Sequence, residues 1–599
     1  MIRDFKSQQK GATCPKVVLK DATSMVLDNT LLKNALRHPR RQWGCPALLL
    51  YFRLAPAVSS QDKASTCAAA IQCLFAGSAL STDNESHWRS GLQLRVRHIV
   101  RNVMFNWLGT IANMAVGFFL APFILHRLGD VAYGVWVLAV SVVGYLGLLD
   151  LGMQSSVLRF VSKGHTQGNH QDASDVISAA LWVRLQLSAL ALLLSFALSA
   201  AFPFLFKIPA ALASDARIAI LLIGVTTAIT LSVGVVAGVL SALNRYDLQN
   251  YVGLTQTAIR VIGVVTVLRT GHGIVAIAVC ELVATIVGEI WLTWLARRLY
   301  PELKIRLAKP KKETLRQIWV YSSYAFLTTI AVQLVYQADN LVVGAFVSAS
   351  AVTYYAIANS LCRYSNQIIS SIGGTFVPAA STYEAAGDAA GLLALYRNGT
   401  RTTIMVSLPI LVTLAIGGRT FVSLWMGPQY GHSSGILLII LCSSLFFAFA
   451  NRTAASIAFG VEKHKTAALW AISEGIANLA LSITLVHWYG IYGVALGTTI
   501  PSLVANLFFW PRYVSKLVGL STFDVVWKVW GPMILAGVPF AIATYAVNAL
   551  LPTPSLAIFF LQVFAVLPVF FISVALIFRH YVRQRVMPRV RSLLFSRAQ

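Results

Sequence analysis

The sequence predicts an all-α integral membrane protein with about fourteen transmembrane helices, arranged as two pseudo-symmetric six-helix lobes plus two extra C-terminal helices. Three observations lead to this fold class. Of the 599 residues, 57% are hydrophobic and 12% are charged, and soluble proteins carry about twice that charged fraction. From Arg95 onward, apolar segments of the roughly 20 residues that cross a bilayer follow one another. The two halves of this series also show weak internal similarity, which is typical of secondary transporters.

The first 94 residues differ in composition from the rest of the chain. They are polar and basic, and their two apolar stretches, at 45–54 and 67–80, are too short to span a membrane. An apolar region this far from the start does not fit a cleaved signal peptide. We therefore expect a poorly ordered basic extension without a fold of its own.

The longest internal loop, RRLYPELKIRLAKPKK at 297–312, divides the apolar segments into six and eight. Short turns on either side of it lead into similar helix starts, YGVW at 133–136 and TYYA at 353–356. The predicted organisation is an N-terminal extension at 1–94, an N-lobe of spans one to six at 95–299, a basic cytoplasmic loop at 300–315, a C-lobe of spans seven to twelve at 316–518, and spans thirteen and fourteen with a basic cytoplasmic tail at 519–599.

The basic residues predict the orientation of the chain in the membrane. If the first span starts in the cytoplasm, the inner loops and ends hold roughly five times as many Lys and Arg as the outer connections. Both termini are then expected to be cytoplasmic. The net charge of +26 is explained by attraction to an anionic leaflet, so nucleic acid is not an expected partner. The seven cysteines lack metal-type spacing, and neither a metal site nor a cofactor is expected.

Ionisable side chains inside the expected spans are the first candidates for function. A charge at the centre of a membrane helix costs roughly 2.5–3.5 kcal/mol, so such residues usually face a functional interior. Glu281 and Glu289 lie about 80° apart around one helix and can face one cavity. The second span, expected as one continuous helix at 131–158, carries Asp150. The embedded ionisable residues are Asp150, Arg184, Arg260, Glu281, Glu289, Asp339, Arg363, Arg452 and Glu474.

Two stretches of this sequence resemble a known family. Residues 128–161 read LGDVAYGVWVLAVSVVGYLGLLDLGMQSSVLRFV, and the second half contains QADNLVVG at 337–344, YYAIA at 354–358 and Pro378. This order of residues is similar to that of the polysaccharide-repeat flippases of the O-antigen (Wzx) type. They belong to the multidrug/oligosaccharidyl-lipid/polysaccharide exporter superfamily. The resemblance extends from about Arg95 to the mid-500s, and the first 94 residues depart from it.

The resemblance implies a transporter rather than an enzyme. Such a flippase moves polyprenyl-pyrophosphate-linked oligosaccharide repeat units across the bacterial inner membrane by alternating access, for export of O-antigen of lipopolysaccharide, capsule or exopolysaccharide. Implied partners are this lipid-linked glycan, the lipid bilayer, a polysaccharide polymerase and the chain-length machinery. Alternatives are a multidrug or metabolite exporter, a lipid II flippase, or a membrane enzyme of glycan assembly. The sequence has no GxxxxGK phosphate loop and only short outer loops, which argues against the enzyme.

The residue types suggest roles within such a flippase. Arginine offers a planar fork that fits phosphate oxygens, and amides and aromatic rings suit a sugar. The candidate substrate-binding residues are Arg260, Arg363, Arg159, Tyr336, Gln337 and Asn359. The candidates for gating or ion coupling are Asp150, Glu281, Glu289, Asp339 and Glu474. Arg260 and Arg363 could instead pair with acids, and the glutamates could instead form interhelical hydrogen bonds.

Overall fold

The computed structural model describes residues 82–303, 310, 312–463 and 465–579. The chain divides between Arg97 and His98 into two units, and the account below concerns the second unit. Most of the expected extension at 1–94, most of the loop at 300–315 and the tail beyond residue 579 lie outside the described residues.

The described residues form helices connected by short turns, and no strand occurs among them. Three irregular helical segments, η3 to η5, interrupt the series. The elements that matter for the argument are α4 (Thr82–Gly144), η3 (Tyr145–Asp150), α5 (Met153–Gln167), α6 (His170–Leu205), α7 (Ala210–Ala242), α8 (Tyr246–Arg269), α9 (Ile274–Leu299), α10 (Lys312–Phe346), α11 (Ala349–Gly374), α12 (Phe376–Ala385), α13 (Ala389–Trp425), α14 (Pro428–Ala450), α15 (Arg452–Gly460), α16 (Lys465–Val504), η4 (Ala505–Phe509), α17 (Trp510–Val518), α18 (Thr522–Asp524), η5 (Val525–Trp530), α19 (Gly531–Leu550) and α20 (Leu556–Ile577).

The number of membrane-length helices agrees with the sequence. Ten stretches of the described chain are long and apolar enough to cross a membrane. Two of them, Trp107–Asp150 and Lys465–Val518, break at Gly129 and Gly490, so each contains two helices. Helices α10 and α11, of 35 and 26 residues, are also long enough. Counted by length alone, the described part of this multi-pass membrane protein therefore contains fourteen helices that could cross a membrane, and the predicted all-α membrane fold is confirmed.

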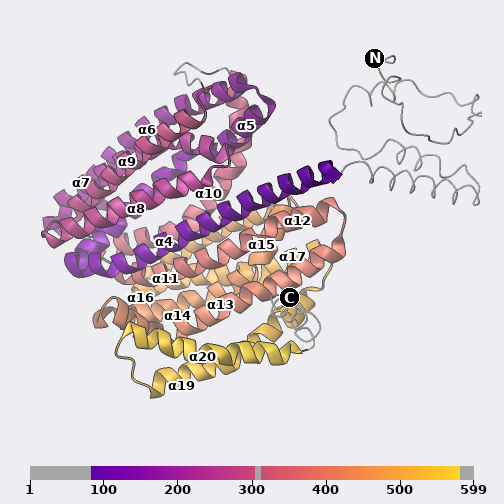
Figure 1. Cartoon of the computed structure of the whole chain (residues 1–599). Helices are drawn as coiled ribbons and strands as arrows, with labels where there is room; N and C mark the ends of the chain where they lie inside the picture. Colours follow the sequence, from indigo (N-terminus) through magenta and orange to yellow (C-terminus); the bar gives the residue numbers. More distant parts are fainter. Residues whose placement is uncertain (1–81, 304–309, 311, 464, 580–599) are drawn as a thin grey trace, which may run out of the picture. The chain divides into compact units, whose positions relative to one another are not determined.

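The packing of the helices follows their order in the chain. Helices α6 and α9 both pack on α7, and α8 packs on α9. In the second half, α14 packs against α11, α13 and α16. The last two helices, α19 and α20, lie side by side (Figure 1) and also contact α13. The division into an N-lobe, a C-lobe and an added helix pair stays a prediction.

The second span is not the continuous helix expected at 131–158. The α-helix ends at Gly144, six residues form the 3₁₀ helix η3, and α5 begins only at Met153. Leu151 between them has φ 51°, a left-handed conformation that costs a non-glycine residue about 1–2 kcal/mol. Irregular backbone at membrane depth is stable only inside protein or along a cavity. Asp150 therefore lies at a helix break, a feature that the apolar pattern did not reveal.

The start of the second span is joined to α10 and α11 by hydrogen bonds. Ser350 donates to the Asp130 carboxylate at 2.5 Å, and Thr353 donates to the Asp130 carbonyl oxygen at 2.6 Å. Farther along the span, Asn340 donates to Ser141 at 3.1 Å. These contacts join segments about 200 residues apart in the sequence. We call these three hydrogen bonds, which join the first and second halves of the chain, the Asp130 closure.

A glycine makes the Asp130 closure tight. A Cβ atom at Gly134 would overlap the carbonyl oxygen of Ala349. Gly134→Ala is therefore expected to push α4 and α11 apart and to lower the free energy of unfolding by about 1–3 kcal/mol, as overpacking does. The measurement is thermal unfolding of the purified protein in detergent.

Gly253→Ala is the matched control for this prediction. Gly253 lies in α8, and no atom lies within 4 Å of the Cβ position that alanine would add. Alanine is the better helix former, so this variant should unfold at the wild-type temperature or slightly above it. Equal unfolding temperatures for the Gly134 and Gly253 variants would contradict the close approach.

Candidate functional site

A polar cavity of about 290 Å³ lies among helices of the second half of the chain. Its walls come from α10, α11, α14, α15, α16, η4 and α17. The volume is at the lower end of the roughly 300–1,000 Å³ that is usual for small-molecule sites. Polar and charged side chains line it together with apolar ones, and Trp510 adds an aromatic ring. The polar residues that line it are Asp339, Asn359, Arg363, Ser444, Asn451, Arg452, Glu474, Asn478, Thr498, Ser502 and Asn506.

Arg363 gives the polar cavity an accessible positive charge. It lies on α11, it is exposed, and its Nη2 donates to Ser360 Oγ at 3.2 Å. Among the residues that the structure describes, no ion pair links it to an acid. Asn359 lies one helical turn before it and lines the same cavity. A cation with an amide beside it can bind an anionic ligand that also carries hydroxyl groups.

A buried carboxylate lies in the wall of the same cavity. Asp339 is 3% exposed, and its Oδ2 accepts hydrogen bonds from Tyr355 at 2.7 Å and Thr498 at 2.9 Å. Its Oδ1 has no hydrogen-bond partner among the described residues, and neither does the Nδ2 of Asn478. Asn478 Oδ1 accepts from Ser482 at 3.0 Å. Asn478 is close enough to the Asp339 carboxylate to interact with it, and a carboxylate oxygen, unlike an amide N–H, can take up a proton or a cation.

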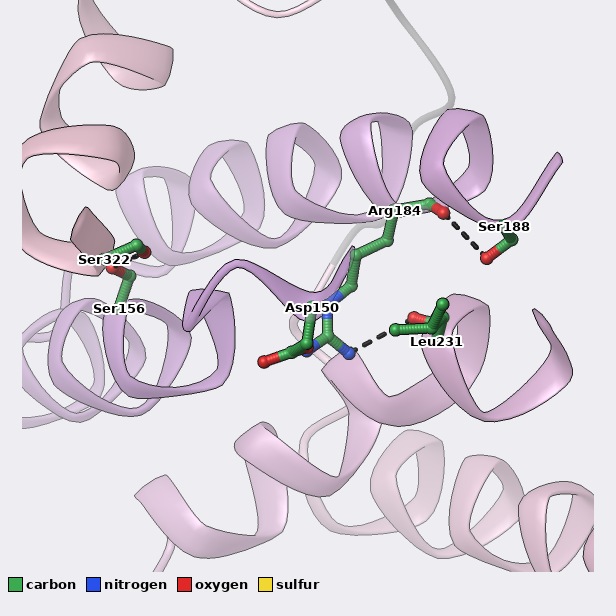
Figure 2. A network of polar contacts seen from close by, with 6 residues as sticks. All are labelled: Asp150, Ser156, Arg184, Ser188, Leu231 and Ser322. Carbon is green, nitrogen blue, oxygen red and sulfur yellow. Dashed lines mark hydrogen bonds and ion pairs between the residues drawn. The ribbon is translucent and has the colours of Figure 1, made fainter. Parts of the chain in front are cut away.

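The first half of the chain contains a separate network around Asp150 (Figure 2). Arg184 on α6 is 2% exposed and forms an ion pair with Asp150 at the end of η3. Its Nη1 donates to the carbonyl oxygen of Leu231 on α7 at 3.2 Å. Glu289 on α9 interacts electrostatically with the same guanidinium. Arg184 thus connects the break in the second span to its own helix α6 and to the neighbouring helices α7 and α9.

Arg260 pairs with an acid, which was one of the two alternatives that the sequence allowed. Its Nε lies 2.6 Å from Glu281 Oε2, so the pair joins α8 to α9. Arg260 does not line the polar cavity. Glu281 and Glu289 share α9, but they interact with different arginines, Arg260 and Arg184. The Oε2 atom of Glu289, which is 8% exposed, has no hydrogen-bond partner among the described residues.

The predicted site residues therefore fall into several places. The polar cavity brings together Arg363, Asn359, Asp339 and Glu474. Gln337 on α10 lies beside α4, because a Cβ added at Gly144 would lie 3.6 Å from its Nε2. Arg159 is exposed on α5, and the side chain of Tyr336 lies outside the described residues. The remaining candidates lie in the Asp150 and Arg260 networks described above.

Other residues of the cavity were not among the predicted site residues. Arg452, assigned from sequence to an inner helix end, lines the cavity and donates to Ser370. Asn451 Nδ2 donates to the carbonyl oxygen of Asn506 at 2.9 Å. These residues lie where helices are interrupted, between α14 and α15 and in the π-helix η4. Such π-turns are frequent at functional sites, and the nearby Pro511 was the available signal in the sequence.

Comparisons with known proteins agree with this architecture. Residues 99–384 match the family described as "Polysaccharide biosynthesis protein". The Bacillus subtilis (strain 168) membrane protein EpsK, itself uncharacterized, is 25% identical over 438 residues, which are 72% of this chain and 86% of EpsK. A Shigella flexneri protein named as a proposed O-antigen transporter is 20% identical over 405 residues, 67% of this chain and 94% of that protein.

A solved structure supplies the comparison of folds. The inward closed conformation of the lipid II flippase MurJ aligns with a TM-score of 0.63 at 15% identity, over 81% of this chain and 100% of the MurJ chain. At this level of identity the likeness concerns the fold alone. The helices of this chain are therefore arranged in a fold similar to that of MurJ. Residues 99–384 of this chain are thus similar to the polysaccharide biosynthesis protein family.

Proposed function

We propose that this chain is a flippase that moves a polyprenyl-pyrophosphate-linked oligosaccharide across the bacterial inner membrane, for export of O-antigen, capsule or exopolysaccharide. The observation that carries the proposal is Arg363, a cation without a described acid partner at the wall of the polar cavity. The family match and the relative named as a proposed O-antigen transporter support it. A polysaccharide polymerase and chain-length machinery are the proposed protein partners.

The chemistry of the cavity fits a phosphorylated sugar. A pyrophosphate carries at least two negative charges, and moving it through bare hydrocarbon is prohibitively costly. Arg363 supplies a fixed charge and a planar fork for the phosphate oxygens. Asn359 offers an amide for sugar hydroxyls, and Trp510 offers a flat ring. An exporter of organic cations would need an acidic and aromatic cleft, so the accessible arginine disfavours that alternative.

Alternating access is part of the same proposal. The basic residues predict that both termini are cytoplasmic, and the Asp130 closure would then lie at the outer face. The polar cavity includes Ala468, three residues after the start of α16 at Lys465, on the side assigned to the cytoplasm. The structure then corresponds to a state closed to the outside. Reversal would require breaking the hydrogen bonds of Asp130 with Ser350 and Thr353.

Ion coupling is assigned, within this proposal, to the buried carboxylates. Asp339 has a carboxylate oxygen without a hydrogen-bond partner among the described residues, and Glu474 lines the same cavity. A proton or sodium ion bound there would neutralise charge close to Arg363 and so change the affinity for an anionic substrate. Glu281 and Glu289 hold ion-coupling or gating roles in the first half, where Asp150 fixes the break in the second span.

Deletion of the gene followed by analysis of lipid-linked intermediates tests the proposed function. Complete repeat units should accumulate on the cytoplasmic face, because synthesis continues while transfer across the membrane stops. Re-expression of the full chain should restore surface glycan. Accumulation of unfinished units would instead identify an enzyme of glycan assembly, and normal surface glycan would contradict a role in its export.

A further inference from the structure

A second cavity, of about 470 Å³, is lined mainly by the first half of the chain and is apolar. Its walls come from α4, η3, α6 and α10. Nearly every lining residue has a purely hydrocarbon side chain, and Tyr145 supplies the single hydroxyl group. Cavities lined in this way exclude water and take up apolar ligands. We call it the apolar cavity, and its chemistry calls for a hydrocarbon occupant.

The break in the second span shapes the apolar cavity. Leu146, Leu148 and Leu149 come from η3. A 3₁₀ helix is narrower than an α-helix and places side chains at i and i+3 above one another. Leu146 and Leu149 therefore share one side of η3, and the narrow segment leaves space next to α6. The same break that holds Asp150 thus creates one wall of the cavity.

The opposite wall reaches the membrane. Leu194 and Leu205 of α6 line the cavity and are 37% and 53% exposed. Their neighbours Leu193 and Phe196 are each 66% exposed on the same helix. Large apolar side chains exposed on a membrane-spanning helix face lipid chains. The apolar cavity is therefore accessible to a hydrocarbon chain that enters sideways from the bilayer.

Helix α10 separates the apolar cavity from the polar cavity. Leu341 lines the first and Asp339 the second, and residues two apart on an α-helix point to nearly opposite sides. The amide of Gln337 lies close to Gly144, directly before the cavity residue Tyr145. One molecule with a polar head and a long apolar tail could therefore contact both sides of this helix.

We infer that the apolar cavity binds the isoprenoid chain of the lipid-linked substrate, next to the phosphate end. This inference rests on the proposed function, because it assigns the tail of the same molecule whose head binds near Arg363. The two cavities lie close together, because Tyr145 of the apolar cavity interacts electrostatically with Asp339 of the polar cavity. The chain extends from η3, α6 and α10 into the bilayer.

Photolabelling of the full chain in nanodiscs tests this inference. The probe is a polyprenyl pyrophosphate with a diazirine on an isoprene unit near the pyrophosphate, and labelled peptides are identified by mass spectrometry. Label is expected on residues 145–149 and 194–198. Excess unlabelled polyprenyl pyrophosphate should abolish it, and excess phosphatidylglycerol should not. Equal competition by phosphatidylglycerol would mean that the cavity holds ordinary lipid chains and would overturn the inference.

Two variants on α6 provide a matched comparison. Leu198→Trp fills the cavity from its wall and should lower labelling about tenfold, because the chain loses buried contact area. Leu193→Trp adds the same ring on the lipid-facing side and should label as the wild type does. Equal labelling of both variants would contradict the assignment. Mapping of the label in the unmodified chain decides the question even if Leu198→Trp does not fold.

A second probe separates this inference from the proposed function. A polyprenyl pyrophosphate with the diazirine attached at its pyrophosphate end should label residues of the polar cavity. If that label appears but the isoprene label lies elsewhere, the tail assignment is wrong and the proposed function stands. If neither probe labels the chain specifically, the proposed function fails along with the inference.

Discussion

Replacing Arg363 by alanine is expected to stop export of the glycan while the protein remains in the membrane at normal abundance. Arg363 has no acid partner among the described residues, and it lines the polar cavity. Two charge-assisted hydrogen bonds to a pyrophosphate contribute about 3–6 kcal/mol together, so their loss should slow transfer roughly 10²–10⁴-fold. Surface glycan measured by immunoblot or by sugar staining is the readout.

Two further variants sharpen this test. Arg363→Lys keeps the charge and loses the planar fork, so partial export is expected. Arg298→Ala is the matched control, because Arg298 lies at the end of α9, stacked 5.2 Å over Trp294 and outside the polar cavity. It should export normally. Normal surface glycan in Arg363→Ala would remove Arg363 from the substrate site.

Replacing Arg184 by methionine is expected to destabilise the protein rather than to alter substrate recognition. The guanidinium is 2% exposed, pairs with Asp150 and donates to Leu231. Breaking a buried pair from one side costs about 3–5 kcal/mol, because the remaining charge is left without a partner. The Asp150 side chain is 30% exposed, and solvent screening puts the expected loss near the lower end of that range. Denaturant or thermal unfolding of the purified protein measures it.

A double-mutant cycle distinguishes a paired charge from simple packing. Asp150→Leu combined with Arg184→Met removes both charges, and replacing a buried pair by apolar residues is often nearly neutral. The double variant should therefore be more stable than Arg184→Met alone, with an interaction energy of about 1–3 kcal/mol. Additive losses from the two single variants would show that the ion pair does not hold the break in the second span.

The membrane architecture could be predicted because hydrophobic length is a strong signal. Segments of about 20 apolar residues have no other stable arrangement than a helix in lipid, so α6, α7 and α9 follow directly from composition. The break at η3 could not be predicted in the same way. Residues 146–149 read LGLL, and an apolar run looks the same whether its backbone is α-helical or 3₁₀. Gly152, with φ 71°, starts the next helix, and the ion pair of Arg184 with Asp150 at the break comes from another helix.

The sequence indicated which ionisable residues were candidates for the site, but it did not indicate which of them lie together. Embedded charges are rare enough that Arg363, Asp339 and Glu474 could be selected from the sequence, and the structure places all three at one cavity. Arg260 carries the same signal and yet pairs with Glu281. Whether an arginine faces a ligand or an acid depends on a neighbouring helix, and the spacing of charges along one helix does not contain that information.

Transfer of substrate by the purified full chain in proteoliposomes tests the central claim most directly. The substrate is a polyprenyl-pyrophosphate-linked oligosaccharide with a fluorescent sugar, and a membrane-impermeant quencher reports how much of it reaches the opposite leaflet. The account predicts fast transfer by the wild type, and transfer by Arg363→Ala no faster than in protein-free liposomes. Equal transfer by both proteins, or none by the wild type, would contradict a cationic polar cavity as the path of the glycan head.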